Sequence, residues 1–419
     1  MKLGSWVFAV LSLSSASLFA ADWPQWRGPD RNGISKETGL LAEWPKEGPK
    51  LLWRVDDIDY GYSTPSVVGD RLYLMSNKGD DDEFVRALSV KDGKIVWSKR
   101  VGKVGPNQRM NYAAARSTPT VDGNVLYALG SDGDLVCLEL AGGSIKWQKN
   151  LRKDFGGEPG AWAYSESPLI DGDALVCTPG GQDASMICLN KKNGEVIWKC
   201  QVPDGDAAAY ASPIIVQVNG QKEYVQFMTK GLVGVDAKTG KFLWRYTKTA
   251  TGSPAVIPTP VAHENLVYSS AAFTGGGLIK IKAENGAATA EQVYYERGLP
   301  VAIGGSILID GNLYGTNQNG LVCAEFATGK VKWQDKSIGT GSLCCAENRF
   351  YIHGENGQVA LVEVSPEGYH EKGRFTPPDP PKHIRGGMER SWVYPVVANG
   401  RLYIRDAGTL WCYDVKKGE

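Results

Sequence analysis

Five side chains from distant parts of the sequence have the chemistry to bind one planar or anionic ligand. They are two cations, one carboxylate and two indoles: Arg116, Lys230, Glu166, Trp162 and Trp392. Cations pair with anionic oxygens, and indole rings stack on planar groups or on cations. We therefore predict that these residues form a ligand-binding site. The alternative is that Arg116 and Glu166 only pair with each other and hold two structural units together.

Residues so far apart can meet only if the fold brings them together, and the sequence contains two repeated phrases. The first is a turn that ends in a tryptophan four residues after a glycine. Its five clear copies end at Trp97, Trp147, Trp198, Trp244 and Trp333. Looser copies end at Tyr295 and Phe375, and LLW at Trp53 stands alone near the N-terminus. A glycine followed by an apolar run is typical of a hairpin that enters a strand.

The second phrase is a short strand, a turn and another strand, and it occurs eight times. It begins with STPSVVGDRLY at Ser63 and ends with VYPVVANGRLY at Val393. The prolines at the first and last copies, Pro65 and Pro395, are 330 residues apart over seven intervals, a period near 47. A unit of this length with four short β-runs and glycine-containing turns is typical of a propeller blade.

The sequence thus predicts an all-β fold, an eight-bladed β-propeller of four-stranded antiparallel blades. We name the strands of each blade A to D. Strand A follows the proline of the second phrase, or the residue that stands in its place, and we call this residue the anchor. After residue 414 the chain has no strand D for the last blade. Residues 51–55, which include Trp53, form an orphan strand D at the other end. We predict that this N-terminal strand completes the last blade, because the pairing removes two open sheet edges.

Three regions of the chain differ in composition. Residues 1–20 combine Lys2, an apolar run and small residues, which is typical of a secretory signal peptide cut after Ala20. Residues 21–50 match no blade phrase and are predicted to be an extended segment wrapped over the propeller. Residues 51–419 are the propeller itself. We expect a periplasmic or secreted protein with no transmembrane segment in the mature chain.

Eight cysteines in an exported protein permit disulfides, but their placement argues against a dense framework. Four of them occupy the same point of the repeat and are predicted to be core residues: Cys137, Cys188, Cys323 and Cys412. Cys344 and Cys345 are adjacent, and neighbouring strand residues point to opposite faces. We expect two unlinked thiols there, with a strained vicinal disulfide as the alternative.

The overall charge and the missing motifs exclude several classes of function. Lys and Arg number 46, as do Asp and Glu, so the formal net charge is zero. A neutral chain is not expected to bind nucleic acid. The sequence has no HExxH, GxSxG, P-loop or CxxC motif, which argues against hydrolase and nucleotide-binding functions. We expect a monomer.

The lengths of the connections indicate which face of the ring carries function. The A–B and C–D turns open on one face, and the B–C turns and D–A loops open on the other, which we call the D–A face. Three D–A connections are long, such as the 22 residues from Trp97 to Pro119. Long loops on a rigid scaffold are where binding residues concentrate. The topology places the five candidate residues on this face.

Several stretches resemble a known family. VGVDAKTGKFLW, ending at Trp244, resembles the tryptophan-docking repeat of PQQ-binding-like β-propellers, and DWPQWRGPDRNGIS and SESPLIDGDALVCTPGG are similar to an exported bacterial subgroup. The family includes quinoprotein dehydrogenases and the outer-membrane-assembly scaffold propeller. Membership of the dehydrogenase branch would imply PQQ with calcium. Trp162 and Trp392 would then stack on the quinone, Arg116 and Lys230 would pair with its carboxylates, and Glu166 would hold the metal.

Three hypotheses about function follow. The first is an exported soluble propeller that binds a small ligand or a partner protein on the D–A face without catalysis. It rests on the neutral charge and on Val301-Ala302-Ile303 standing where the subgroup often has paired histidines before Gly304-Gly305. The alternatives are a PQQ-dependent dehydrogenase of alcohols or sugars and an outer-membrane protein assembly scaffold. No catalytic residue and no definite metal site is assigned.

Overall fold

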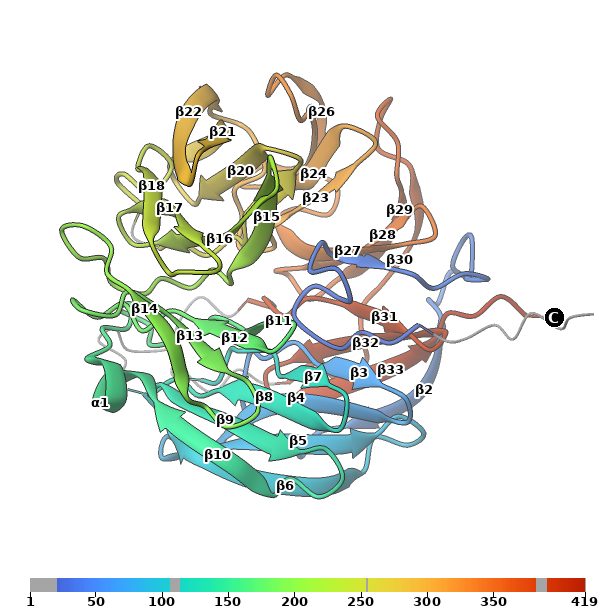
Figure 1. The fold of residues 1–419 in the computed structure, drawn as a ribbon. Coiled ribbons are helices and arrows are strands. Elements are labelled where there is room, and N and C mark those ends of the chain that lie inside the picture. The colour runs from blue at the N-terminus through green and yellow to red at the C-terminus, as the bar shows by residue number, and fades with distance from the viewer. Residues whose placement is uncertain (1–20, 106–113, 254, 382–389, 419) are drawn as a thin grey trace, which may run out of the picture.

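The chain forms a ring of eight blades, each of four antiparallel strands, which confirms the predicted eight-bladed β-propeller (Figure 1). The sheet of blade 7 has one additional strand from the N-terminal segment. The computed structural model describes residues 21–105, 114–253, 255–381 and 390–418. The predicted signal peptide lies outside the described residues. Within that described part, no helix has the length and apolar character needed to span a membrane.

The first four blades follow one another along the chain. Blade 1 contains β3 (Ser66–Val68), β4 (Arg71–Lys78), β5 (Asp82–Ser89) and β6 (Ile95–Lys103). Blade 2 contains β7 (Thr120–Asp122), β8 (Val125–Leu129), β9 (Asp134–Glu139) and β10 (Ile145–Asn150). Blade 3 contains β11 (Leu169–Asp171), β12 (Ala174–Cys177), β13 (Met186–Asn190) and β14 (Val196–Cys200). Blade 4 contains β15 (Ile214–Val218), β16 (Gln221–Met228), β17 (Gly231–Asp236) and β18 (Phe242–Tyr246).

The second half of the ring has the same order, except at its end. Blade 5 contains β19 (Val261–His263), β20 (Leu266–Ala271), β21 (Gly275–Glu284) and β22 (Ala287–Glu296). Blade 6 contains β23 (Ser306–Ile309), β24 (Asn312–Asn317), β25 (Gly320–Glu325) and β26 (Val331–Asp335). Blade 7 contains β27 (Gly341–Ala346), β28 (Arg349–Gly354), β29 (Val359–Glu363) and β30 (Glu371–Phe375). Blade 8 contains β31 (Val396–Ala398), β32 (Arg401–Asp406), β33 (Thr409–Asp414) and β2 (Lys50–Val55).

The N-terminal strand β2 closes the ring, as predicted. It pairs antiparallel with β33, and Trp53 lies opposite Cys412. The outermost strand of blade 8 therefore comes from the other end of the propeller sequence. This pairing gives β33 a partner on both sides and leaves it no open edge.

The glycine and tryptophan of the first repeated phrase contact each other between neighbouring blades. Trp97 of blade 1 lies on Gly143 in the C–D turn of blade 2, and its Nε1 donates to the carbonyl of Leu140 at 3.1 Å. A Cβ at Gly143 would lie 2.7 Å from that indole, and the glycine has a φ of +71°. Both the close approach and the left-handed backbone require glycine. The repeat spacing is therefore the spacing of an inter-blade contact.

All eight cysteines are buried and free. Cys344 packs in the hydrophobic cluster between blades 7 and 8, whereas Cys345 packs in the cluster between blades 6 and 7. The two side chains point to opposite faces of β27, which confirms the expected pair of unlinked thiols.

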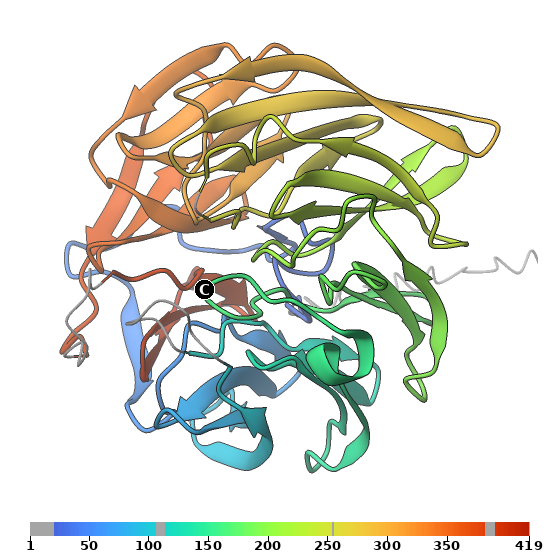
Figure 2. The ribbon, with the colours of Figure 1, turned by 90° about the vertical axis from the view of Figure 1, so that its left-hand side faces the viewer.

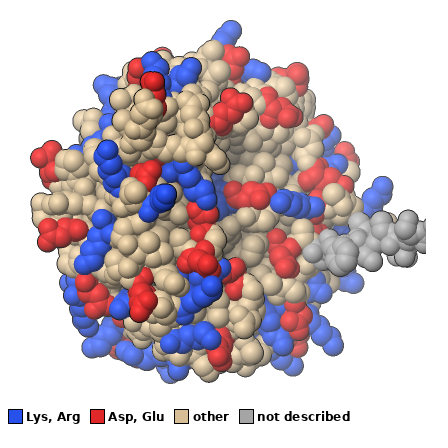
Figure 3. Space-filling view, in the orientation of Figure 1, with Lys and Arg blue, Asp and Glu red and all other residues tan. Residues whose placement is uncertain are grey.

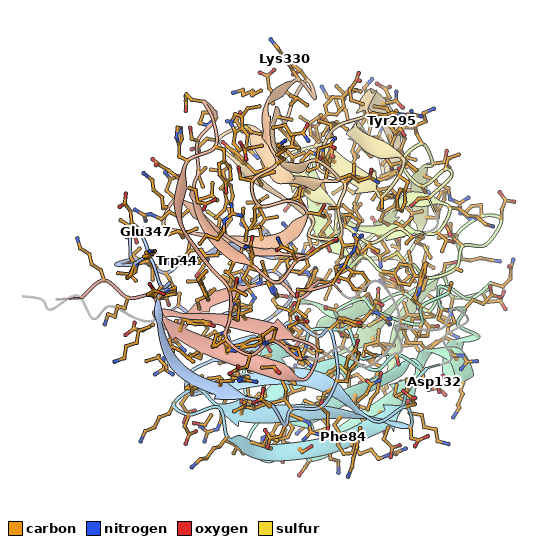
Figure 4. All side chains as sticks on the ribbon, turned by 180° about the vertical axis from the view of Figure 1, so that it is seen from behind. Trp44, Phe84, Asp132, Tyr295, Lys330 and Glu347 are labelled. Carbon is orange, nitrogen blue, oxygen red and sulfur yellow. The ribbon has the colours of Figure 1, made fainter. Side chains whose placement is uncertain are left out.

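The segment before β2 lies over the middle of the ring on the face of the A–B turns (Figure 1). Its short strand β1 (Ile34–Ser35) pairs parallel with the inner strand β27, and Trp23 forms an isolated bridge with Val67 of β3. Trp23 is 1% exposed. Farther along, Trp44 lies beside Glu347 at the edge of the ring (Figure 4) and packs against Phe375. Residues 22–48 therefore cross the channel and leave it at blade 7; we call them the plug.

Two plug side chains enter the channel on the side of blades 5 and 6. The Trp26 Nε1 donates to the Thr259 hydroxyl at 2.9 Å, and the Arg27 guanidinium donates to the Ser306 carbonyl. Gly305 leaves room for the guanidinium, because a Cβ there would lie 2.7 Å from Arg27 Nη1. Small residues at the starts of these inner strands thus make space for the plug.

The D–A loops extend on the other face, toward the viewer of Figure 2. One contains a single helical turn that the repeat pattern does not predict, α1 (Leu151–Phe155). The Asn150 side chain caps it by accepting from the backbone of Arg152 and Lys153, and Gly156 ends it in the left-handed conformation. Five residues are too few for helical periodicity to be visible in the sequence.

Candidate functional site at the D–A mouth of the channel

Aromatic side chains and one arginine form an arc around the D–A mouth of the channel. The rings of Trp392 and Tyr62 lie 5.6 Å apart, and the Arg116 guanidinium lies 5.8 Å from the Tyr62 ring. The Arg116 Nη1 donates to the carbonyl of Trp162 at 2.7 Å, and the Trp162 ring lies 5.8 Å from Tyr210. These contacts run from blade 8 through blades 1, 2 and 3 to blade 4. The arc, defined by these five residues, brings together three of the five predicted site residues.

Arg116 is the charged centre of the arc. Burial lowers the pKa of its guanidinium, and the nearby phenols of Tyr62 and Tyr210 and the carboxylate of Glu83 oppose this effect. Glu166 is not among these neighbours, and the described residues show no ion pair between Arg116 and Glu166. The alternative in which these two residues pair to hold blades together therefore has no contact to support it.

Glu166 is buried between blades 3 and 4, outside the arc, and is 2% exposed. Its carboxylate accepts from the Thr178 backbone at 2.6 Å and from the Gln226 side chain at 2.9 Å. Burial raises its pKa to about 7, and the charge of Arg31 from the plug acts in the opposite direction. An enclosed carboxylate with this pKa is half protonated near neutrality.

Trp392 is held in the arc by groups of blade 7. Its Nε1 donates to Glu355 at 3.2 Å, and its carbonyl accepts from the Ser342 hydroxyl at 3.0 Å. Glu355 also pairs with Arg390 at 2.5 Å. These groups orient the indole, whose ring is tilted by 46° relative to that of Tyr62.

Lys230 is not part of the arc. It is exposed in the B–C turn of blade 4, and its ammonium donates to the carbonyls of Asp204 and Gly205 at 2.7 and 2.9 Å. These bonds direct it toward the loop between blades 3 and 4. The structure thus places Arg116, Trp162 and Trp392 together in the arc, Glu166 between blades 3 and 4, and Lys230 apart from both.

The predicted site residues leave out Tyr62 and Tyr210 of the arc and three further residues of this mouth. Tyr60 bonds its hydroxyl to that of Tyr62 at 2.6 Å, Glu355 orients Trp392, and Glu83 receives two hydrogen bonds from Ser131. Tyr60 could have been found from its spacing, because it lies two residues before Tyr62 on an extended segment. Glu83 and Glu355 follow no repeat position, so no sequence signal marks them.

The hydroxyl groups beside the strand A anchors tie neighbouring blades together. The Ser167 hydroxyl of blade 3 accepts from the Thr118 backbone of blade 2, and the Ser212 hydroxyl of blade 4 accepts from the Ser167 backbone, both at 2.9 Å. Thr64 does the same for Tyr394 across the closure at 3.3 Å. These hydroxyls satisfy backbone groups where the inner strands converge.

The described residues do not fit PQQ with calcium. PQQ carries three carboxylates, and its calcium needs several oxygen ligands. Arg116 already donates to two carbonyls, and Glu166 is enclosed by its own donors. Among the described residues, no group of three or more His, Cys, Asp or Glu side chains could hold a metal.

The fold and the arc define a β-propeller of tryptophan-docked repeats with an aromatic mouth at one end of its channel. The chain belongs to the PQQ_2 family, described as "Outer membrane protein assembly factor BamB", whose model matches residues 30–183, 117–335 and 178–419. The predicted resemblance to PQQ-binding-like propellers is confirmed.

Individual relatives show how far the similarity extends. The outer membrane protein assembly factor BamB of Yersinia pestis is 31% identical over 242 residues, which cover 53% of this chain and 55% of the relative. The quinoprotein alcohol dehydrogenase PedH of Pseudomonas putida is 22% identical over 219 residues, covering 51% and 33%. The matched part thus spans about half or less of these curated relatives. The crystal structure of BamB from Moraxella catarrhalis shares the fold, with a TM-score of 0.59, 14% identity, and coverage of 87% and 98%.

Proposed function

We propose that this chain is an exported binding propeller that docks a segment of a partner protein on its D–A face. The observation that carries the proposal is the arc of Trp392, Tyr62, Arg116, Trp162 and Tyr210, whose side chains are half-buried on a rigid ring. Trp, Tyr and Arg are the residue types that dominate binding energy at protein interfaces. The assembly factors among the relatives are consistent with a protein partner.

Export is supported by a contact at the predicted cleavage site. The backbone nitrogen of Ala21 donates to Glu37 at 2.5 Å, and Glu37, only 7% exposed, also accepts from the backbones of Asn399 and Gly400. Cleavage after Ala20 would convert that nitrogen into an ammonium group. The ammonium would form an ion pair with a carboxylate that is already in place.

A site-specific crosslinking experiment tests the docking proposal. A photoreactive amino acid replaces Trp162 in the arc and, as the matched control, Asp122 in an A–B turn on the opposite face. We expect a discrete adduct in the native compartment from position 162 only, and we expect Tyr62→Ala to abolish it. Adducts of equal yield from both positions, or an adduct that survives Tyr62→Ala, would refute docking at the arc.

A second measurement separates this proposal from the dehydrogenase alternative. PQQ and calcium are mixed with the purified full chain, and the quinone spectrum and dye reduction are recorded. A binding propeller leaves both unchanged. A shifted quinone spectrum with substrate-dependent dye reduction would favour the dehydrogenase instead.

A further inference from the structure

A cavity lies beside the plug, on the face opposite the D–A face. It has a volume of about 640 Å³, within the range of small-molecule sites. Its floor is made of plug residues, including Arg27 and Arg31, and its walls come from blades 3 to 6. In the space-filling view, this face is hollowed near its middle, with charged side chains around the hollow (Figure 3).

The plug leaves this part of the face uncovered. The plug bonds through its backbone to Val67 of blade 1 and Cys345 of blade 7, and through Glu37 to Asn399 of blade 8. It reaches blades 3, 5 and 6 through the side chains of Arg31, Trp26 and Arg27. The inner strands of blades 3 to 6 face the cavity instead, with Leu169 and Ile214 among their lining residues. The cavity is therefore a consequence of the path that the plug takes.

The two arginines in the floor are buried and incompletely bonded. Arg27 and Arg31 are 3% and 8% exposed. Arg27 donates through Nη2 to the carbonyls of Ser306 and Asn32. Arg31 donates through Nη1 and Nη2 to the carbonyls of Pro168 and Ser167 at 3.2 and 3.1 Å, and through Nη1 to the Gln25 side chain at 3.1 Å. Among the described residues, the Nε and Nη1 of Arg27 and the Nε of Arg31 have no hydrogen-bond partner.

The charges around the arginines leave the floor positive. Arg27 and Arg31 repel each other, and Glu166 is the carboxylate that acts on Arg31. Glu166 can supply at most one negative charge for two guanidinium groups. Asp30 and Asp310 line the cavity but are exposed, and Asp30 already pairs with Lys36 at 2.9 Å. A buried cation without a full counter-charge is costly, and an anion at this floor would relieve the cost.

The walls add an apolar component. Ile214, Leu308 and Phe326 line the cavity together with His263, whose ring lies 6.5 Å from that of Phe326. A fully inorganic anion would make no use of these walls. An anion that carries an apolar body would use both the walls and the floor.

We propose that this cavity binds a small organic carboxylate, with its oxygens toward Arg27 and Arg31 and its apolar body against Ile214, Leu308 and Phe326. Arginine suits this task because its planar fork matches a carboxylate. The cavity is separate from the docking arc, which lies at the other end of the channel.

Titration calorimetry on the full chain tests the proposal with hexanoate as the probe. Hexanol, acetate and sulfate serve as the neutral, short and inorganic comparisons. We expect hexanoate to bind more tightly than acetate, by up to about fourfold for each buried methylene group. We expect Arg27→Gln and Arg31→Gln each to weaken hexanoate by about tenfold or more. Trp26→Phe, which loosens the plug without changing its charge, should leave hexanoate binding in place.

A further variant keeps the test informative if the arginine variants fail to fold. Glu166→Gln removes the competing carboxylate while preserving its shape, so hexanoate should bind more tightly than to the unmodified chain at a pH above 7. The proposal would be overturned if hexanol bound as tightly as hexanoate, if sulfate alone bound, or if hexanoate did not bind. Weaker binding of hexanoate by Glu166→Gln would also overturn it.

Discussion

Replacing Gly93 with alanine tests the contact that closes the ring. Gly93 lies in the C–D turn of blade 1 with a φ of +72°, under the indole of Trp53 from the N-terminal strand. An alanine in the left-handed conformation costs about 1–2 kcal/mol. Its Cβ would also lie 2.8 Å from the Trp53 ring and 2.9 Å from Val55, which forces an overpacking cost of about 1–3 kcal/mol. We therefore expect the free energy of unfolding to fall by about 2–5 kcal/mol in all.

Gly123→Ala is the matched control for that measurement. Gly123 has a φ of +60° in an A–B turn, and a Cβ there would meet nothing within 4 Å. The free energy of unfolding of Gly123→Ala should therefore fall only by the cost of the left-handed backbone, about 1–2 kcal/mol. Urea unfolding followed by tryptophan fluorescence gives both values. Equal losses for Gly93→Ala and Gly123→Ala would show that the Trp53 contact does not hold the ring closed.

Three other changes have defined outcomes. Burial raises the pKa of Glu166 from 4.5 to about 7, so its contribution to stability, present below pH 4.5, should be lost between pH 4.5 and 7, by about 3 kcal/mol. Glu166→Gln should flatten this part of a profile of unfolding free energy against pH. An unchanged slope would contradict the raised pKa of Glu166. Trp244→Phe removes a 2.7 Å bond to the buried Glu223 and should cost about 2–3 kcal/mol in urea unfolding, and a cost below that of Trp198→Phe would contradict it. Glu37→Gln should lower thermal stability by about 1 kcal/mol more in the chain cut before Ala21 than in the uncut chain, and equal losses would argue against an ammonium at that position.

The architecture was predictable because its signals are local. The spacing from a glycine to the following tryptophan, as in Gly143 and Trp147, recurs in every clear repeat. Each such glycine packs against an aromatic ring of the preceding blade. A short spacing in the sequence therefore predicts a contact between neighbouring blades. The missing strand D after residue 414 and the orphan strand at Trp53 likewise predict the closure, which the pairing of β2 with β33 confirms.

The site was only partly predictable, because its contacts depend on segments that follow no repeat. Residue type and the expected D–A face predicted Arg116 and Trp392, and the arc contains both. No pattern indicated that Lys230 turns toward the carbonyls of a neighbouring loop, or that the plug places Arg31 near Glu166. Such contacts join residues that are far apart in sequence and carry no periodic signature.

The two sides of the channel differ because the inner strands of the blades around it start with different side chains. Blades 8 and 1 to 4 present the large groups that form the arc at the D–A mouth. Blades 5 and 6 start with Thr259 and Gly305, and the plug fills this space with Trp26 and Arg27. Arg31 crosses to blade 3 and donates to the carbonyl of Ser167, next to Glu166. A ligand that changes the charge balance at the plug would therefore act on the buried carboxylate of Glu166 between blades 3 and 4.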